Sequence, residues 1–391
     1  MGKKPRTTQR ARKRRDSTNE RNVEGYKNSR ITTRKAKDSR KAHNSDSRKT
    51  RDSNEIRLDY LPNPPLNTEL SNLIIPNHAF YSIADKEATS RIEGARATLK
   101  KRFGKKSALP FSFSASGFVE LFLSFKTIYF LPTIHYEIRR ALEIVRPRTE
   151  QIQLSAPAKL LESDILLPDD RQKDEILMIA PLINEDIFSL NQIPEIRNAT
   201  LMLDISYALA LGLEEVYNIE CQKAHIAVAN ATPLGLPSGF GLILSDKIHT
   251  SSVYRNGVSE AFLGAIDERR LQFKRVDKNL NLKFFETLKA HFNKHIDLFS
   301  RDFVPHTLPL RFRHINTRYL IEHLYLENIF AQPAQDCALG FVKPSHTLLA
   351  QGFSPVQARE LCAVSFESLG DMELLAQKLF ESYRMIRLME F

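Results

Sequence analysis

The sequence predicts an α/β protein with a mainly parallel central sheet, a smaller C-terminal α+β domain and a basic N-terminal tail. The segments EILMIAP (175–181) and TLMLDI (200–205) are continuous apolar runs, which are typical of strands buried on both faces. Segments with helical periodicity alternate with such runs along most of the chain, as expected for helices that cover a parallel sheet. The excess of positive charge lies almost entirely before residue 58.

Length and composition indicate a soluble globular protein that is large enough for two domains. The chain has 391 residues, of which 42% are hydrophobic and 26% are charged. No apolar run approaches the roughly 18 residues of a membrane span, so we expect no membrane partner. Cys221, Cys337 and Cys362 stand far apart and lack the spacing of a zinc site. We therefore expect a cytoplasmic protein without a metal.

Residues 1–57 form the basic tail. They hold 20 of the 57 Lys and Arg residues but 7 of the 46 acidic residues, which leaves 37 basic and 39 acidic residues for positions 58–391. The tail contains no Leu, Phe or Trp, so it cannot bury enough apolar surface to offset chain entropy and is predicted to be disordered. Its charge favours nonspecific binding of nucleic acid or another polyanion, and a merely solubilising extension is an equal alternative.

The rest of the chain is divided into an arm and two domains. Residues 58–83 are rich in Pro and Asn, and we expect this arm to wrap over a surface without forming an element. The large domain is assigned to 84–265 and the small C-terminal domain to 266–391. Residues 84–104 predict a helix that ends at Gly104, with Ile92, Ala95, Leu99 and Phe103 on one face.

Three further segments have a clear pattern. FSFSASGFVELFLSF (111–125) reads as a strand, a turn of small residues and a helix, while LILS (242–245) and LCAVSF (361–366) read as strands. A last helix is expected after Gly370. Its apolar stripe consists of Leu375, Leu379, Tyr383 and Ile386.

Polar side chains follow several of these strands, and in open α/β sheets ligands gather at the strand ends. Ser114, Ser116 and Gly117 precede a helix, so their backbone N–H groups offer a phosphate site. The remaining candidates are His135, whose imidazole suits a flat ring, Asn184, and Asp204, whose buried carboxylate needs a donor. Each residue alone also suits a purely structural role.

The segment ATPLGLPSGFG (231–241) contains three glycines and two prolines and leads directly into the apolar run LILS. Glycine allows positive φ and proline fixes φ, so this composition predicts a tight turn that feeds a strand.

Taken in order, these segments resemble the class V aminotransferases, fold-type I pyridoxal-phosphate enzymes that include cysteine desulfurases and phosphoserine aminotransferases. FSASGFVE (113–120) resembles the family's F-T-x-G-x-T-E turn, and residues 184–186 resemble its N-E-x-G segment. Residues 204–207 are similar to D-x-x-[HQS], and 232–241 to K-x-L-G-x-P-x-G-x-G. The segment from Ala363 to Leu379 resembles the R-x-S segment and last helix, so the likeness covers about residues 70–390.

The resemblance implies a homodimer and a cofactor site. Ser114, Ser116 and Gly117 would hold phosphate, and His135 would stack on the ring. Asp204 would pair with the pyridinium nitrogen, with Asn184 and Ser206 beside it.

Several positions depart from the family pattern. Thr232 occupies the position of the Schiff-base lysine, and a hydroxyl cannot form that bond. Ala363 stands where many members carry an Arg that receives the substrate carboxylate. In the phosphate turn, Phe118 and Val119 replace a small residue and a threonine.

Three functional hypotheses remain open. The first, which we favour, is a degenerate, lysine-less protein whose role is structural, regulatory or the noncovalent binding of pyridoxal phosphate or pyridoxamine phosphate. The second is an active transferase or desulfurase-type enzyme that uses Lys223 as the Schiff-base residue, or pyridoxamine phosphate with His225 as a base. The third is a polyanion-binding protein that acts through its tail.

Overall fold

The structure is a computed structural model that describes residues 55–74, 86–146, 150–153, 175–191, 198–213, 218–246, 263–265, 279–334 and 343–389. The tail is predicted to be disordered, and its residues 1–54 lie outside the described residues. Cys337 lies outside them as well.

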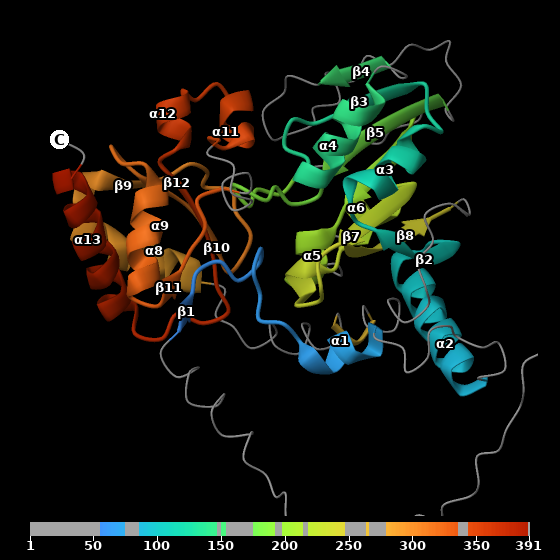
Figure 1. Ribbon diagram of the computed structural model, residues 1–391, viewed down its shortest axis with the longest axis horizontal. Coiled ribbons are helices and arrows are strands. Elements are labelled where there is room, and N and C mark those ends of the chain that lie inside the picture. Colours follow the sequence, from blue (N-terminus) through green and yellow to red (C-terminus); the bar gives the residue numbers. More distant parts are fainter. Residues whose placement is uncertain are drawn as a thin grey trace, which may run out of the picture. The chain divides into compact units, whose positions relative to one another are not determined.

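Residues 107–245 contribute a seven-stranded sheet with the strand order β2-β8-β7-β6-β5-β3-β4 (Figure 1). Strand β8 pairs antiparallel with β2 and β7, and the other four pairings are parallel. The strands are β2 (Ser107–Ser112), β3 (Thr127–Phe130), β4 (Glu150–Gln153), β5 (Ile176–Pro181), β6 (Thr200–Asp204), β7 (Ile226–Asn230) and β8 (Phe240–Ser245). The mainly parallel sheet is therefore as predicted.

Both faces of this sheet are buried, which explains its continuous apolar strands. In β5, Ile176 and Met178 belong to one core cluster, whereas the alternating Leu177 and Ile179 belong to another. Helices α2 (Lys86–Phe103) and α5 (Ser206–Ala210) pack in the first cluster, and α3 (Ala115–Phe122) and α4 (Tyr136–Val145) in the second. A short helix, α6 (Asn218–Lys223), precedes β7.

Helix α2 agrees with the helix predicted at 84–104. Ala95, Leu99 and Phe103 are buried on one face, and Gly104 follows the last helical residue with φ of 62°. That left-handed conformation is the common helix ending for which glycine is suited.

The C-terminal part contains a three-stranded antiparallel sheet of order β12-β10-β9. Its strands are β9 (Ile296–Leu298), β10 (Thr307–Phe312) and β12 (Leu361–Ser365). Its helices are α8 (Leu280–Phe292), α9 (Thr317–Leu326), α11 (His346–Ala350), α12 (Pro355–Ala358) and α13 (Met372–Met389), and a 3-10 turn (Asn293–His295) follows α8. The predicted stripe of α13 is buried in one cluster with Phe284, Phe292 and Phe312.

The arm differs from its prediction, because it contains helix α1 (Thr68–Ile74). Asn67 starts this helix: its Oδ1 accepts the N–H of Leu70 at 2.9 Å, and its carbonyl accepts the N–H of Ser71 at 2.9 Å. The sequence N-T-E-L-S carried this capping signal, but the surrounding prolines and asparagines suggested an irregular segment.

The end of the predicted tail also takes part in the fold. Ile56 and Arg57 form β1, which pairs in parallel with β11 (Ile329–Phe330). The Arg57 guanidinium lies over the Phe330 ring at 4.7 Å from its centroid. The following residue, Leu58, is fully buried, so the described fold already includes the last residues assigned to the tail.

Within the described parts of the chain, no helix combines the length and the apolar character that crossing a membrane requires.

Candidate functional site at the strand ends

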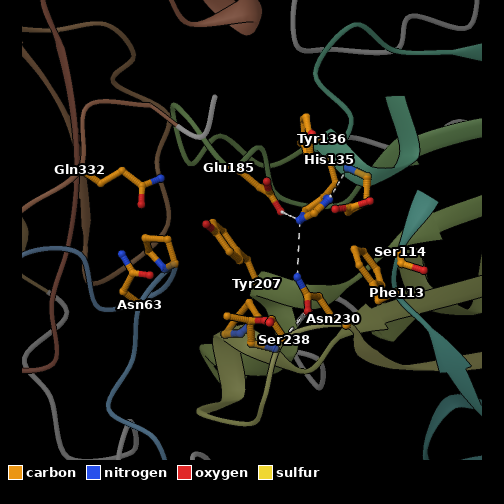
Figure 2. A pocket seen from close by; sticks show the side chains of 15 residues that line it. Asn63, Phe113, Ser114, His135, Tyr136, Glu185, Tyr207, Asn230, Ser238 and Gln332 are labelled. Carbon is orange, nitrogen blue, oxygen red and sulfur yellow. Dashed lines mark hydrogen bonds and ion pairs between the residues drawn. The ribbon is translucent and has the colours of Figure 1, made fainter. Parts of the chain in front are cut away.

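A cavity of about 440 Å³ lies where the parallel strands end (Figure 2). Residues of the large domain form most of its wall, and the N-terminal arm and the segment after β11 complete it. The lining residues are Pro62, Asn63, Phe113, Ser114, His135, Tyr136, Glu137, Glu185, Tyr207, Asn230, Thr232, Pro233, Ser238, Gly239 and Gln332. Of the predicted site residues, Ser114, His135 and Thr232 line this cavity.

The predicted phosphate turn lies between β2 and α3. Ser114 caps α3, because its Oγ accepts the N–H of Gly117 at 3.4 Å, and it lies 2.6 Å and 3.0 Å from the hydroxyls of Ser112 and Ser116. A Cβ at Gly117 would come within 2.2 Å of the Ser112 carbonyl oxygen. Glycine is therefore required here by the close approach of the helix to its own strand.

Glu137 is one of the cavity residues that the sequence motifs did not reveal. It lies in the first turn of α4, and its Oε2 accepts the N–H of Ala115, the first residue of α3, at 2.7 Å. The contact joins residues 22 positions apart, so no local pattern predicts it. A carboxylate thus occupies the start of the helix that the motifs assigned to phosphate.

His135 ends the turn after β3 and caps α4. Its Nδ1 accepts the N–H of Glu137 at 3.0 Å, so the proton of the neutral ring is on Nε2. Burial, aided by the charge of Arg139, lowers the pKa of His135 to about 3. Nε2 lies 3.4 Å from Nδ2 of Asn230 and 3.8 Å from Oε1 of Glu185. Because the ring is neutral, the contact with Glu185 is not an ion pair.

In the segment after β5, neighbouring side chains have different roles: some make structural hydrogen bonds and one lines the cavity. Asn184 is fully buried, and its Oδ1 accepts the N–H groups of Asp186 and Ile187 at 3.0 Å and 2.9 Å, so it shapes the turn. Asp186 accepts a hydrogen bond from the Ser345 hydroxyl at 2.6 Å. Only Glu185 of this segment faces the cavity.

Asp204 ends β6 and is not among the residues that line the cavity. Its Oδ1 accepts the N–H of Ser206 at 2.9 Å and the Ser206 hydroxyl at 2.5 Å. Burial raises the pKa of Asp204 to about 6, although the two Ser206 hydrogen bonds oppose the shift. The Ser206 Oγ also accepts the N–H of Asn230 at 2.8 Å. Asp204 and Ser206 therefore tie β6 to the end of β7, where Asn230 faces the cavity.

Thr232 begins a 3-10 turn, Thr232–Leu234, directly after β7, and its N–H donates to Oδ1 of Asn230 at 3.0 Å. The two alternative residues, Lys223 and His225, lie before β7. Nδ1 of His225 accepts the N–H of Leu201 at 3.0 Å, and Lys223 is exposed. A five-residue strand spans about 17 Å, so β7 separates these residues from Thr232.

The glycines of the 231–241 corner are explained by backbone geometry. Gly235 and Gly239 have φ of 74° and 84°, which side-chain-bearing residues rarely adopt. A Cβ at Gly241 would lie 2.8 Å from the Ala229 carbonyl oxygen and 2.8 Å from Cβ of Phe113. The corner is thus built for tight packing, and it places Thr232 and Ser238 on the cavity wall.

The opposite wall carries an amide. Ala363, which the sequence resemblance pairs with the family's arginine, is buried in β12 and donates its N–H to the carbonyl of Gln332 at 2.9 Å. The Gln332 side chain points toward the cavity from the side opposite His135 (Figure 2). Gln332 is 4% exposed, and its Oε1 has no hydrogen-bond partner.

The charge of the wall is negative. Glu137 and Glu185 contribute carboxylates, and no lysine or arginine is found among the described residues that line the cavity.

The sequence matches no protein family model and no curated protein. Its fold matches solved structures. A NifS-like protein from Rickettsia africae ESF-5 has a TM-score of 0.66 and 16% identity, covering 85% of this chain and 99% of that one. A cysteine desulfurase from Thermococcus onnurineus NA1 has a TM-score of 0.63 and 11% identity, covering 85% and 95%.

An aspartate aminotransferase from Thermus thermophilus has a TM-score of 0.57 and 12% identity, covering 85% of this chain and all of that one. At such identities the likeness shows the fold alone. That fold is the fold-type I transferase fold that the order of the sequence motifs implied.

Proposed function

We propose that this protein is a lysine-less representative of the fold that binds a small ligand of the vitamin B6 type noncovalently and has a structural or regulatory role. The observation that carries the proposal is the position of Thr232, which lines the cavity directly after β7. The sequence resemblance assigns Thr232 to the position of the family's Schiff-base lysine, and a hydroxyl cannot form that bond.

Pyridoxal phosphate is the cofactor that the resemblance implies, and when bound it supplies an electron sink for amino-acid chemistry. The cavity suits its ring, because His135, Tyr207 and Phe113 offer aromatic and apolar surface. Its phosphate fits less well, since the Ala115 N–H already bonds the Glu137 carboxylate. The described residues therefore suit a pyridine ring better than a phosphorylated one.

The neutral state of His135 supports binding rather than acid–base work. With its pKa lowered to about 3 by burial, the imidazole keeps its proton on Nε2 through the neutral pH range. The ring is also held in edge contact with Phe113, with centroids 4.8 Å apart. Its role in the proposal is to form one face of the ring site.

The enzyme hypothesis has less support. Lys223 and His225 precede β7, whereas the cavity-lining residues Asn230 and Thr232 lie at its end. Using either residue would require a site at the opposite edge of the sheet.

The experiment is borohydride reduction of the purified protein in the presence of stoichiometric pyridoxal phosphate, followed by peptide mapping. We expect no pyridoxyl group on the segment 221–247 of the wild type. The variant Thr232→Lys should acquire one at position 232, together with a visible absorbance band.

Two controls sharpen this result. Ser238→Lys places a lysine elsewhere on the same wall and should not acquire the band. Lys223→Ala should behave as the wild type does. A reducible adduct on Lys223 in the wild type would overturn the proposal and establish the enzyme hypothesis.

Polyanion binding through residues 1–57 is a second candidate function, favoured by their 20 basic against 7 acidic residues. It is compatible with the first, because it concerns a different part of the chain.

A further inference from the structure

We propose that the cavity selects a ligand that carries an ammonium group and no phosphate, because Glu137 holds the anion position at the start of α3. This inference rests on the proposed function, since it names the kind of vitamin B6 compound that the site accepts.

The first step concerns the anion position. The N-terminus of a helix attracts negative charge, and the first N–H of α3 points at Oε2 of Glu137 at 2.7 Å. His135 fixes this arrangement, because its Nδ1 accepts the backbone N–H of Glu137 at 3.0 Å. A ligand phosphate at the same place must displace a carboxylate or lie beside it. Both alternatives weaken binding through like-charge repulsion.

The second step is an independent observation on the opposite wall. Gln332 is 4% exposed, and its Oε1 lacks a partner although it is buried. A buried acceptor without a partner is costly. The Gln332 side chain reaches the cavity with its amide nitrogen nearer than Oε1 (Figure 2), and a half-turn of the amide would present Oε1 to a hydrogen-bond donor of a ligand.

The third step is the character of the wall as a whole. Among the described lining residues, Glu137 and Glu185 are anionic and none is a lysine or arginine. The rings of Phe113, Tyr136 and Tyr207 also line the cavity, and aromatic faces attract cations. Carboxylates, an amide oxygen and aromatic rings together suit an ammonium group, which is a donor and a cation.

Isothermal titration of the full-length protein with three related compounds tests the inference. Pyridoxamine carries the ammonium and no phosphate, pyridoxine carries neither, and pyridoxamine 5′-phosphate carries both. We expect pyridoxamine to bind at least about tenfold more tightly than either of the other two.

Glu137→Gln removes the charge and keeps an oxygen that accepts the Ala115 N–H. In this variant the preference for pyridoxamine over its phosphate should fall by about tenfold. Glu143→Gln is the matched control, because Glu143 lies exposed on the same helix and does not line the cavity. It should leave all three affinities unchanged.

The outcomes separate this inference from the proposed function. Equal affinity of the wild type for pyridoxamine and its phosphate would overturn the role of Glu137, and equal affinity for pyridoxamine and pyridoxine would overturn the ammonium preference. If no vitamin B6 compound binds, benzylammonium and benzyl alcohol are titrated. Binding of benzylammonium alone supports the ammonium site, and binding of neither overturns it. An adduct on Lys223 overturns only the proposed function.

Discussion

At the scale of single residues, Asp204 is a side chain whose pKa the folded protein shifts strongly. Its pKa is raised to about 6 by burial, whereas an unfolded chain has an aspartate pKa near 3.8. Between these two values the folded protein keeps a proton that the unfolded chain has released. Stability from this residue is therefore fully present below about pH 4 and is lost as the pH rises through about 6.

Asp204→Asn removes this titration and keeps an oxygen that accepts the Ser206 hydrogen bonds. Relative to the variant, the wild type should lose on the order of 3 kcal/mol of unfolding free energy between about pH 4 and about pH 7. Urea unfolding of both proteins at the two pH values measures the difference, and contributions common to both, such as that of His135, cancel. A difference that stays constant with pH would show that Asp204 is ionised in the folded protein.

The sequence located the strand ends at which the cavity lies. It did not show which side chains line the cavity and which only shape the turns. Apolar runs followed by polar residues identified the neighbourhoods of Ser114, His135, Asn184 and Asp204. Asn184 and Asp204 are engaged in turns, whereas Glu185 and Tyr207, which follow them closely in the chain, line the cavity. Which of two adjacent side chains faces a cavity depends on turn geometry, and a contact such as Glu137 with Ala115 depends on how two helices pack.

At the scale of elements, two helical glycines differ in whether the surrounding packing leaves room for a side chain. Gly117 lies in the first turn of α3 against Ser112, with no room for a Cβ, whereas a Cβ at Gly94, in the middle of α2, would have no atom within 4 Å.

Gly117→Ala should lower the unfolding free energy by about 1–3 kcal/mol or more, because the new Cβ meets backbone that cannot rotate away. Gly94→Ala is the matched control and should raise it by about 0.5–1 kcal/mol through helix propensity. Thermal unfolding of the two variants measures both effects. If Gly117→Ala were as stable as the wild type, the close approach of α3 to β2 would be wrong.

Elements with a strong apolar period were predictable, and the weakly patterned ones were not. Helices α2 and α13 and strands β5 and β6 follow from periodicity and burial. Helix α1 and strand β1 were not predicted, because each is short and is stabilised by contacts with residues far along the chain.

At the scale of the whole molecule, the chain combines a near-neutral body with a strongly basic first segment. Removing residues 1–54 should leave the melting temperature nearly unchanged, because the described packing begins at residue 55. The same truncation should abolish salt-sensitive retention on heparin or RNA.

The comparison variant lacks residues 1–61. It loses β1 and the buried side chains of Leu58 and Leu61, so its melting temperature should fall steeply. A large loss of stability in the variant that lacks residues 1–54 would show that the tail belongs to the fold. Heparin binding retained by that variant would contradict the polyanion hypothesis.

We also predict a homodimer, as the family resemblance implies. Light scattering of the purified protein at micromolar concentration should report twice the chain mass of 44.8 kDa. A monomer would count against the resemblance extending to assembly.

The pairing of β1 with β11 has a consequence for how the protein is made. Ile56 pairs with Ile329, Leu58 exchanges backbone hydrogen bonds with Phe330 and Ser365, and Asn67 donates to the Gly235 carbonyl. On the ribosome, residues 56–58 emerge early, and their backbone partners Asn328, Ile329, Phe330 and Ser365 are synthesised much later. Such contacts between distant parts of a chain slow folding. A nascent chain that stops before β12 lacks the Ser365 N–H that bonds the Leu58 carbonyl, so β1 and the residue after it complete their backbone contacts only when the last strand has been synthesised.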